Sequence, residues 1–367
     1  MSLSGEHEHV QRYMLSDASA DHPVTAAACC CGAFFAAVEC TLYIVTYPAR
    51  KDYCALPFAA SCMKTCVARG VRKRTLLVVG GFRGALAVFH VLKQPGGRAG
   101  LQELSRARTP VPGIRGAAVT SLAASAAAPL LPAVICGDDA GCARLWALDG
   151  AGAVSGVDVL AQSEELAPLR VDVRGHVYCV CASSWACVAD VSTRDRAQRS
   201  PYPAACGASA SPAAACLVVS AGEPLLCVAR RECVLVLHGD CGSEVASSLV
   251  LLRRIQLDAE LSVPIGMSGD VCSGWVAVLC AGERARGGSR VSLQFRSVHD
   301  GVAGAEFDDD ESGSLCRGLP TLASFGEERR RSRCRIGGLL VAWPCGAIRT
   351  LRMAAPPLES LEPRVRE

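Results

Sequence analysis

The stretch that decides the fold is Pro132–Asp149, PAVICGDDAGCARLWALD. Two short apolar segments, AVIC and CARLWAL, flank the polar turn GDDAG. The turn contains Gly137 and Gly141, and glycine readily adopts the positive φ that a tight hairpin turn requires. The second segment contains Trp146, whose ring offers a large apolar surface for packing. The stretch therefore predicts a β-hairpin that carries a bulky ring on its second strand.

A second copy of this pattern occurs at Leu76–Lys93, LLVVGGFRGALAVFHVLK. Three pairs of positions coincide when the two copies are aligned without gaps: Gly80 with Gly137, Gly84 with Gly141, and Phe89 with Trp146. Five weaker copies follow the same order of strand, turn and strand: Phe34–Pro48, Val177–Thr193, Pro224–Asp240, Trp275–Val298 and Ile336–Met353. The chain therefore contains seven such units.

Further apolar segments lie beside these hairpins. Val24–Ala28, Ala118–Ala123 and Leu169–Val173 each precede a unit, and Leu249–Ile255 follows the fifth unit. Four strands then belong to each unit, and a four-stranded propeller blade takes about 40–45 residues. The 367 residues predict an all-β fold, a single seven-bladed β-propeller of four-stranded antiparallel blades at 21–355, with a flexible tail at 356–367. In this fold we expect each bulky ring to pack against the next blade.

Cys136–Ala147, CGDDAGCARLWA, resembles the core of a WD repeat. Six residues occupy positions of that pattern: Gly137, Asp139, Gly141, Arg144, Leu145 and Trp146. Val79–His90 is similar, with Phe89 at the Trp position. The resemblance implies that residues 1–20 are an N-terminal tail in which Val10–Leu15 completes the last blade as its outer strand.

The sequence also departs from the WD-repeat pattern. Ala147 and His90 replace the Asp of the Trp-Asp pair, and Gly175-His176 is the one Gly-His dipeptide. The hydrogen-bond set of Asp, His, Ser and Trp that the family uses is therefore missing from most blades. We expect the divergent blades to be held together by packing of their sheet faces. The residues at which each blade begins and ends do not follow from the pattern.

The composition excludes several classes of protein. Half of the residues are hydrophobic, which excludes a disordered chain. The 38 basic and 35 acidic residues leave a net charge of +3, too little for a dedicated nucleic-acid binder. Met1–Val10 has no apolar segment typical of a secretory signal. We therefore expect a cytoplasmic or nuclear protein whose 22 cysteines are mostly reduced and buried, with a disulfide framework as the alternative.

Motifs for catalysis or metal binding are incomplete. Cys62 and Cys66 have the spacing of half a zinc site, but no second pair follows at a suitable distance. The glycine-rich Gly80–Gly84 lies between two predicted strands, whereas a dinucleotide site requires a helix after it. Catalytic serine, metalloprotease and phosphate-loop motifs do not occur. The prediction is therefore no catalytic residue, no metal and no cofactor.

Three runs of charge fall between predicted strands and are expected to form exposed loops. Their members are candidates for partner binding, with a solvated loop as the alternative interpretation. The candidates are Arg72, Lys73 and Arg74; Arg329, Arg330, Arg331 and Arg333; and Asp308, Asp309 and Asp310.

Arg253 and Arg254 suggest a different ligand. The segment LLRRI resembles the Phe/Leu-Arg-Arg-Gly motif of propellers that bind phosphoinositides, and it follows the fifth unit. Ile255 replaces the glycine of that motif. The alternative interpretation is an ordinary pair of arginines on a surface strand.

These observations favour a non-catalytic, WD-repeat-like scaffold that binds other proteins within a larger intracellular complex. Partner proteins are expected in preference to nucleic acid, and no membrane span is expected because no apolar run reaches ~18 residues. The first alternative is a peripheral phosphoinositide-binding propeller that uses Arg253 and Arg254, and the second is a propeller enzyme.

Overall fold

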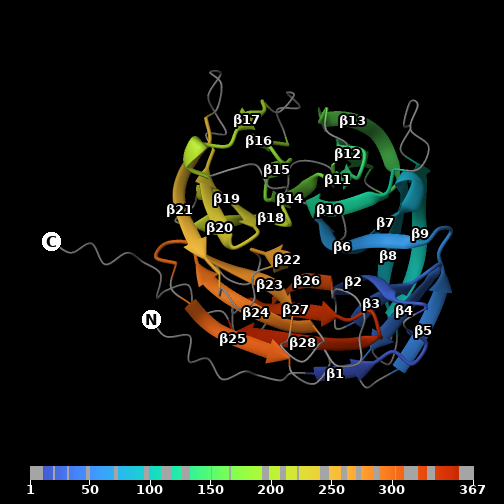
Figure 1. Cartoon of the computed structure of the whole chain (residues 1–367). Coiled ribbons are helices and arrows are strands. Elements are labelled where there is room, and N and C mark those ends of the chain that lie inside the picture. Colours follow the sequence, from blue (N-terminus) through green and yellow to red (C-terminus); the bar gives the residue numbers. More distant parts are fainter. Residues whose placement is uncertain are drawn as a thin grey trace.

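The computed structural model of the chain is a ring of seven antiparallel sheets, each with four strands (Figure 1). This confirms the predicted all-β, seven-bladed propeller. The residues that the structure describes are 11–19, 21–30, 33–46, 50–69, 73–94, 99–108, 117–125, 133–149, 151–164, 167–191, 198–206, 212–220, 223–239, 248–257, 263–269, 274–283, 289–301, 303–309, 321–328 and 335–354. The predicted tail at 356–367 lies outside these ranges.

The first four blades follow one another in the chain, each from its inner to its outer strand. Blade 1 is β2 (Val24–Cys30), β3 (Ala33–Val38), β4 (Thr41–Thr46) and β5 (Arg50–Ala55). Blade 2 is β6 (Ala60–Arg69), β7 (Lys73–Gly81), β8 (Ala85–Lys93) and β9 (Ala99–Arg108). Blade 3 is β10 (Val119–Ser125), β11 (Ala133–Asp138), β12 (Cys142–Leu148) and β13 (Val154–Gln162). Blade 4 is β14 (Arg170–Arg174), β15 (Val177–Cys181), β16 (Trp185–Asp190) and β17 (Ser200–Pro201).

The last three blades complete the ring. Blade 5 is β18 (Ala214–Ser220), β19 (Glu223–Arg230), β20 (Cys233–His238) and β21 (Val250–Gln256). Blade 6 is β22 (Val263–Ser268), β23 (Trp275–Glu283), β24 (Ser289–Ser297) and β25 (Ala303–Asp309). Blade 7 is β26 (Thr321–Glu328), β27 (Arg335–Ala342), β28 (Ala347–Ala354) and, as its outer strand, β1 (Gln11–Met14). The seven hairpins found in the sequence are the middle strand pairs of the seven blades.

The antiparallel order gives the ring two different faces. Turns between the second and third strands of each blade share one face with the connections that lead to the next inner strand; we call it the BC face. It carries the 3-10 turn η1 (Phe82–Gly84) and residues 139–141. Turns between the first and second strands lie on the opposite face, which we call the AB face. Each inner strand begins at the BC face and runs toward the AB face.

Buried apolar side chains fill the spaces between neighbouring blades. Phe89 lies in a cluster with Phe35 and Leu42 of blade 1. Trp146 lies in a cluster with Leu76 and Leu86 of blade 2. Both rings therefore pack against the preceding blade in the chain, and the expected contact with the next blade was wrong. The sequence pattern indicates that the ring is buried. Which neighbouring blade the ring contacts depends on the register of the whole sheet.

The four repeat glycines have two separate physical roles. Gly84 and Gly141 adopt positive φ angles of 64° and 78°, as the turn prediction requires. Gly80 and Gly137 instead allow close approach of the next blade. A Cβ on Gly137 would lie 2.6 Å from the Leu169 carbonyl oxygen, and one on Gly80 would lie 2.8 Å from the Val119 side chain.

A buried ion pair holds the turn of blade 3. Arg144 Nη1 donates to Asp138 Oδ2 at 2.6 Å, and both side chains are almost fully buried. Asp138 Oδ1 also accepts the backbone N–H of Cys142 at 2.8 Å. Asp139, the residue singled out in the sequence, is exposed and accepts the backbone N–H of Ala118 at 2.7 Å. Asp138 is thus the main polar anchor of this turn.

The N-terminal strand closes the ring. β1 pairs with β28 in antiparallel register from Gln11 opposite Thr350 to Met14 opposite Ala347. The Tyr13 ring lies 5.1 Å from the Phe34 ring of blade 1. The first described strand of the chain therefore joins the last blade to the first one.

The cysteines serve mostly as small buried side chains. Sixteen cysteines in the described ranges are free thiols, and eleven of them are buried. Cys345 is disulfide-bonded and is an exception to the expectation of mostly reduced thiols. No helix in the described part of the chain is long and apolar enough to cross a membrane.

Replacing Asp138 with Ala should lower the free energy of unfolding by about 3–5 kcal/mol, because Arg144 is left charged, buried and unpaired. Urea denaturation followed by circular dichroism measures the change. The matched control is Asp139→Ala, which should cost about 0.5–1.5 kcal/mol because it removes one hydrogen bond at an exposed residue. Equal losses for the two variants would contradict the assigned role of Asp138.

Deleting residues 1–14 should lower the free energy of unfolding by about 2–4 kcal/mol, because blade 7 loses its outer strand and Phe34 loses the Tyr13 ring. Deleting residues 1–10 retains β1 and should leave the unfolding midpoint unchanged. Thermal unfolding of the two truncated chains provides the comparison. If the chain without β1 has the same Tm as the full chain, pairing of β1 with β28 contributes nothing to stability.

Candidate binding cavity in the central channel

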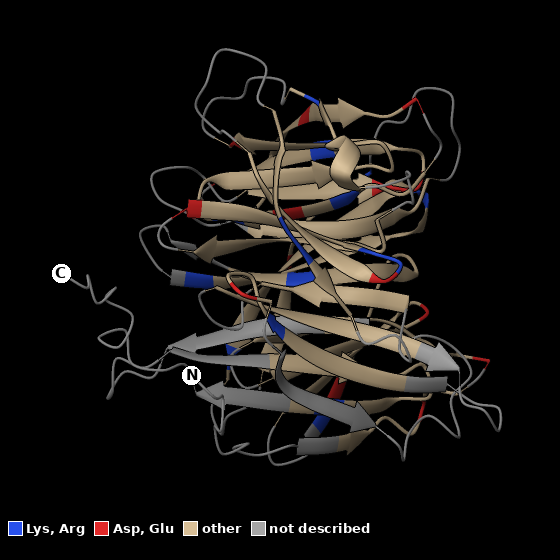
Figure 2. Cartoon of the chain, turned by 60° about the vertical axis from the view of Figure 1, so that its left-hand side comes forward, with Lys and Arg blue, Asp and Glu red and all other residues tan. Residues whose placement is uncertain are grey.

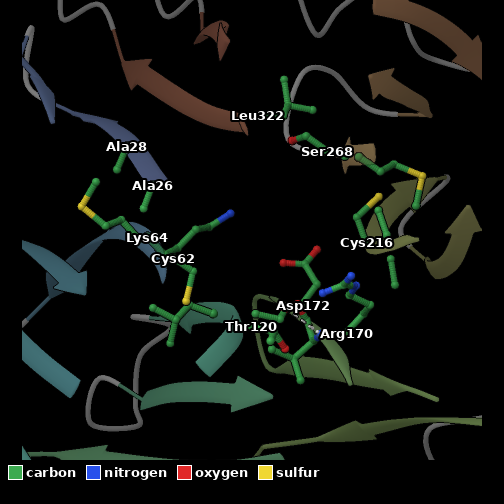
Figure 3. Close-up of a pocket in the computed structure, with 18 of the residues that line it drawn as sticks. Ala26, Ala28, Cys62, Lys64, Thr120, Arg170, Asp172, Cys216, Ser268 and Leu322 are labelled. Atoms are coloured by element: carbon green, nitrogen blue, oxygen red, sulfur yellow. Dashed lines mark hydrogen bonds between the residues drawn. The ribbon is translucent and has the colours of Figure 1, made fainter. Parts of the chain in front are cut away.

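A cavity of ≈ 290 Å³ lies in the central channel, where all seven inner strands converge (Figure 3). Thr25, Ser61 and Thr120 line it from near the first residues of β2, β6 and β10. Because inner strands begin at the BC face, these three residues lie toward that end of the channel, whereas Ser268 and Gly269 line the cavity from the AB end of β22 (Val263–Ser268). Small side chains such as Ala26 and Ala214 leave this space open near the axis.

Polar side chains connect successive inner strands around the cavity. The Thr25 hydroxyl donates to the Ala60 carbonyl at 2.7 Å, and the Ser61 hydroxyl donates to the Val119 carbonyl at 2.5 Å. The backbone N–H of Val171 in blade 4 donates to Ser121 Oγ of blade 3 at 3.0 Å. These contacts fix the spacing of four adjacent blades at the channel wall. We call them the inner belt.

Two charged side chains of β14 continue the inner belt to blade 5. Arg170 Nε donates to the Ala213 carbonyl at 3.0 Å, and Asp172 Oδ2 accepts the backbone N–H of Leu217 at 2.9 Å. Burial lowers the pKa of the Arg170 guanidinium from its usual value. The group remains a cation at neutral pH, because the usual value for arginine lies far above 7.

The charges around the cavity are unequal. Figure 3 shows the Lys64 amine and the Asp172 carboxylate directed toward the middle of the cavity, with the Arg170 guanidinium beside Asp172. Two cations therefore face one carboxylate in a lining that is otherwise neutral. The carboxylate already accepts a backbone N–H, so the cavity favours a ligand that brings a further negative charge.

Two thiols line the cavity, those of Cys62 and Cys216, and burial makes the Cys62 thiol unreactive. Burial raises the pKa of the Cys62 thiol to about 12, and burial also raises the pKa of Cys66 to about 12. Both groups stay protonated at neutral pH and are poor nucleophiles and poor metal ligands in this state. Within the described ranges, no group of three or more His, Cys, Asp or Glu side chains is arranged to hold a metal ion.

The basic and acidic runs are only partly loops. Lys73 and Arg74 are the first two residues of strand β7, and Asp308 and Asp309 are the last two of β25, so their assignment to loops was wrong. Each strand extends further than its apolar segment, because backbone pairing continues past the apolar residues. The other members of these runs lie outside the described residues: Arg72, Asp310, Arg329, Arg330, Arg331 and Arg333. Figure 2 shows charges of both signs interspersed over the strands.

Arg253 and Arg254 do not share one face of their sheet. Both are exposed on the outer strand β21. Arg253 pairs with Val236, which packs toward blade 6, and Arg254 pairs with Leu235, which packs toward blade 4. The Arg253 guanidinium donates to the Asp300 carbonyl at 3.2 Å. The structure therefore does not bring the two arginines together as one ligand site.

Sequence reasoning missed the charged residues of the channel. Arg170, Asp172 and Arg174 alternate with Val171 and Val173 along β14. This alternation with period two indicates a strand with one apolar face and one charged face. The signal is therefore present in the sequence, and it becomes informative once this segment is assigned to the channel wall.

Comparison with known proteins identifies the fold. No family model and no curated protein matches the sequence. Chaetomium thermophilum Sqt1, solved bound to the N-terminus of the ribosomal protein L10, is 11% identical with a TM-score of 0.57, covering 92% of this chain and 89% of Sqt1. BBS1N, solved in complex with ARL6DN, is 12% identical with a TM-score of 0.57, covering 95% of this chain and 96% of its own.

The similar structures are WD40 propellers, as the sequence resemblance predicted. At these identities the likeness concerns the fold, and it extends over nearly the whole of each chain. The chain is therefore a seven-bladed β-propeller with the fold of the WD40 propellers.

Proposed function

We propose that the protein is a non-catalytic scaffold that binds an extended, acidic segment of a partner protein at the channel mouth on the BC face. The observation that carries this proposal is the charge of the central cavity. Lys64 and Arg170 face a single carboxylate, that of Asp172, in a space that an acidic side chain or a terminal carboxylate would fill. Hydrogen bonds between a guanidinium and a carboxylate are among the stronger polar contacts in proteins.

The similar structures support a protein partner. Sqt1 was solved with the N-terminus of a ribosomal protein, and BBS1N was solved with ARL6DN. Both are propellers in complex with another protein, so the fold is suited to this task. A protein partner within a larger intracellular complex also agrees with the nearly balanced charge of this chain, which carries 38 basic and 35 acidic residues.

The chemistry of the cavity favours binding over catalysis. An enzyme would need a nucleophile or a proton-transfer group poised in the channel. The Cys62 thiol is held protonated by burial, and Asp172 and Arg170 are both engaged with backbone groups of blade 5. The groups that face the cavity are therefore arranged to hold the inner strands and to attract charge.

Replacing Lys64 with Glu should abolish capture of the partner, because a second carboxylate then repels an acidic segment from the cavity. The measurement is affinity purification of the tagged chain from native lysate at physiological salt, with quantitative mass spectrometry of the proteins retained. Lys93→Glu is the matched control, because Lys93 is exposed at the AB end of β8 and makes the same charge change.

The proposal requires a protein that both wild type and Lys93→Glu retain and that Lys64→Glu loses. A synthetic peptide copied from the acidic segment of that protein should then bind the wild-type chain, as measured by fluorescence anisotropy. Recovery of the wild-type chain as a lone monomer would contradict the scaffold function. Equal retention by Lys64→Glu would contradict the channel as its site.

A further inference from the structure

One buried arginine of the propeller has an incomplete set of hydrogen bonds. Four arginines in the described ranges are buried: Arg144, Arg230, Arg296 and Arg349. Arg144 is paired with Asp138, and Arg296 donates to the side-chain oxygen of Gln294 at 2.7 Å. Arg230 is 5% exposed, and its Nε and Nη1 atoms have no hydrogen-bond partner. A buried charge in this condition is unfavourable unless an anion compensates it.

Arg230 lies at the BC end of β19, between blades 4 and 5. Its guanidinium stacks on the Tyr202 ring at 4.3 Å, and Nη2 makes a long contact of 3.4 Å with the Ser183 carbonyl. Neither contact neutralises the charge. The neighbouring Glu232 is exposed and forms no ion pair with Arg230 in the described part of the chain. The remaining N–H groups of Arg230 therefore present donors without an acceptor.

A second arginine lies on the same side of blade 5. Arg254 of β21 lies on the face of blade 5 that turns toward blade 4, and β21 packs against the 3-10 turn η3 (Ala204–Cys206). Burial raises the pKa of the Cys206 thiol, while the positive charges of Arg230 and Arg254 act in the opposite direction. Both cations are thus close enough to influence one thiol, and neither is paired with a carboxylate within the described residues.

We propose that Arg230 and Arg254 form a phosphate-binding site between blades 4 and 5, closed over by Tyr202. Phosphate provides several strong acceptors for the unused N–H groups of Arg230, and two guanidiniums match its charge. The site is separate from the channel cavity, and it does not depend on the function proposed for the channel. Arg253 takes no part, because its side chain points toward blade 6.

Tyr202 determines access to this site. Its ring covers the guanidinium from one side. Its hydroxyl donates to the Ala182 carbonyl at 3.3 Å and also interacts with the side chains of Cys181 and Arg230. Rotation of this side chain would break its bond to Ala182 and its contacts with Cys181 and Arg230, and it would uncover the guanidinium. Phosphate binding therefore requires a local movement at Tyr202, and the sheets of both blades keep their structure.

The test is thermal unfolding in phosphate compared with chloride at constant ionic strength. Phosphate should raise the Tm of the wild-type chain by about 2–4 °C more than that of Arg230→Met. Arg231→Met is the matched control, because Arg231 is exposed on the same turn, and it should respond like wild type. Phosphate stabilises many proteins without specific binding, so the difference between variants is the informative quantity.

Two further measurements complete the design. Arg254→Met, a change at an exposed residue, should reduce the phosphate response without altering the fold. The same titration with glycerol 2-phosphate, a soluble phosphate monoester, distinguishes the sources of the phosphate: a response to both compounds indicates a site for esterified phosphate, and a response to inorganic phosphate alone indicates a site for the free ion.

The stability of Arg230→Met in chloride separates binding from a structural role. Loss of an uncompensated buried charge should leave the Tm unchanged or raise it. A phosphate response that is equal in wild type, Arg230→Met and Arg254→Met would overturn the proposal. A large fall in the Tm of Arg230→Met, with no phosphate response in the wild type, would assign Arg230 to packing against Tyr202 and would overturn it as well.

Discussion

Pairing between β1 and β28 is the interaction on which the rest of the structure depends. Each blade buries its two faces against its two neighbours, so no blade is complete until the ring is closed. The cluster that joins the last blade to the first contains Leu15, Phe34 and Leu340, which come from opposite ends of the described chain. A propeller gains its closing contact only after the whole chain has folded, and four residues at Gln11–Met14 supply the backbone part of it.

The inner belt explains how divergent blades keep a regular channel. Most blades lack the hydrogen-bond set of the usual WD repeat, and in blade 3 the Trp146 ring nitrogen donates to Cys136 Sγ at 3.1 Å. Spacing at the axis is instead fixed by side chains such as Thr25, Ser61 and Asp172, each of which bonds to the backbone of an adjacent blade. Small residues suit the inner strands because the sheets are closest together near the axis, whereas large rings fit farther out.

The fold could be predicted from the sequence alone because the repeat is visible both in the turns and in the strands. Gly84 and Gly141 mark turns through their required φ angles, and alternating apolar residues mark the strands beside them. The direction of Trp146 could not be predicted, since it depends on which face of the sheet meets the preceding blade. The separation of Arg253 from Arg254 follows from the two-residue period of a strand and could have been derived. The burial of Arg230 could not, because Tyr202 and Ser183 come from another blade.

The two cationic sites lie in environments of different polarity, and this difference sets how each one acts. The Lys64 amine faces the channel cavity, where dissolved ions screen charge over about 8–10 Å. In the proposed function, such a site would attract an acidic partner from a distance, and the attraction would weaken as salt is added. Arg230 is buried, so its interaction with an anion is screened little and depends on close contact. A propeller of modest net charge can therefore combine a salt-sensitive protein contact with a salt-resistant anion site on the same face.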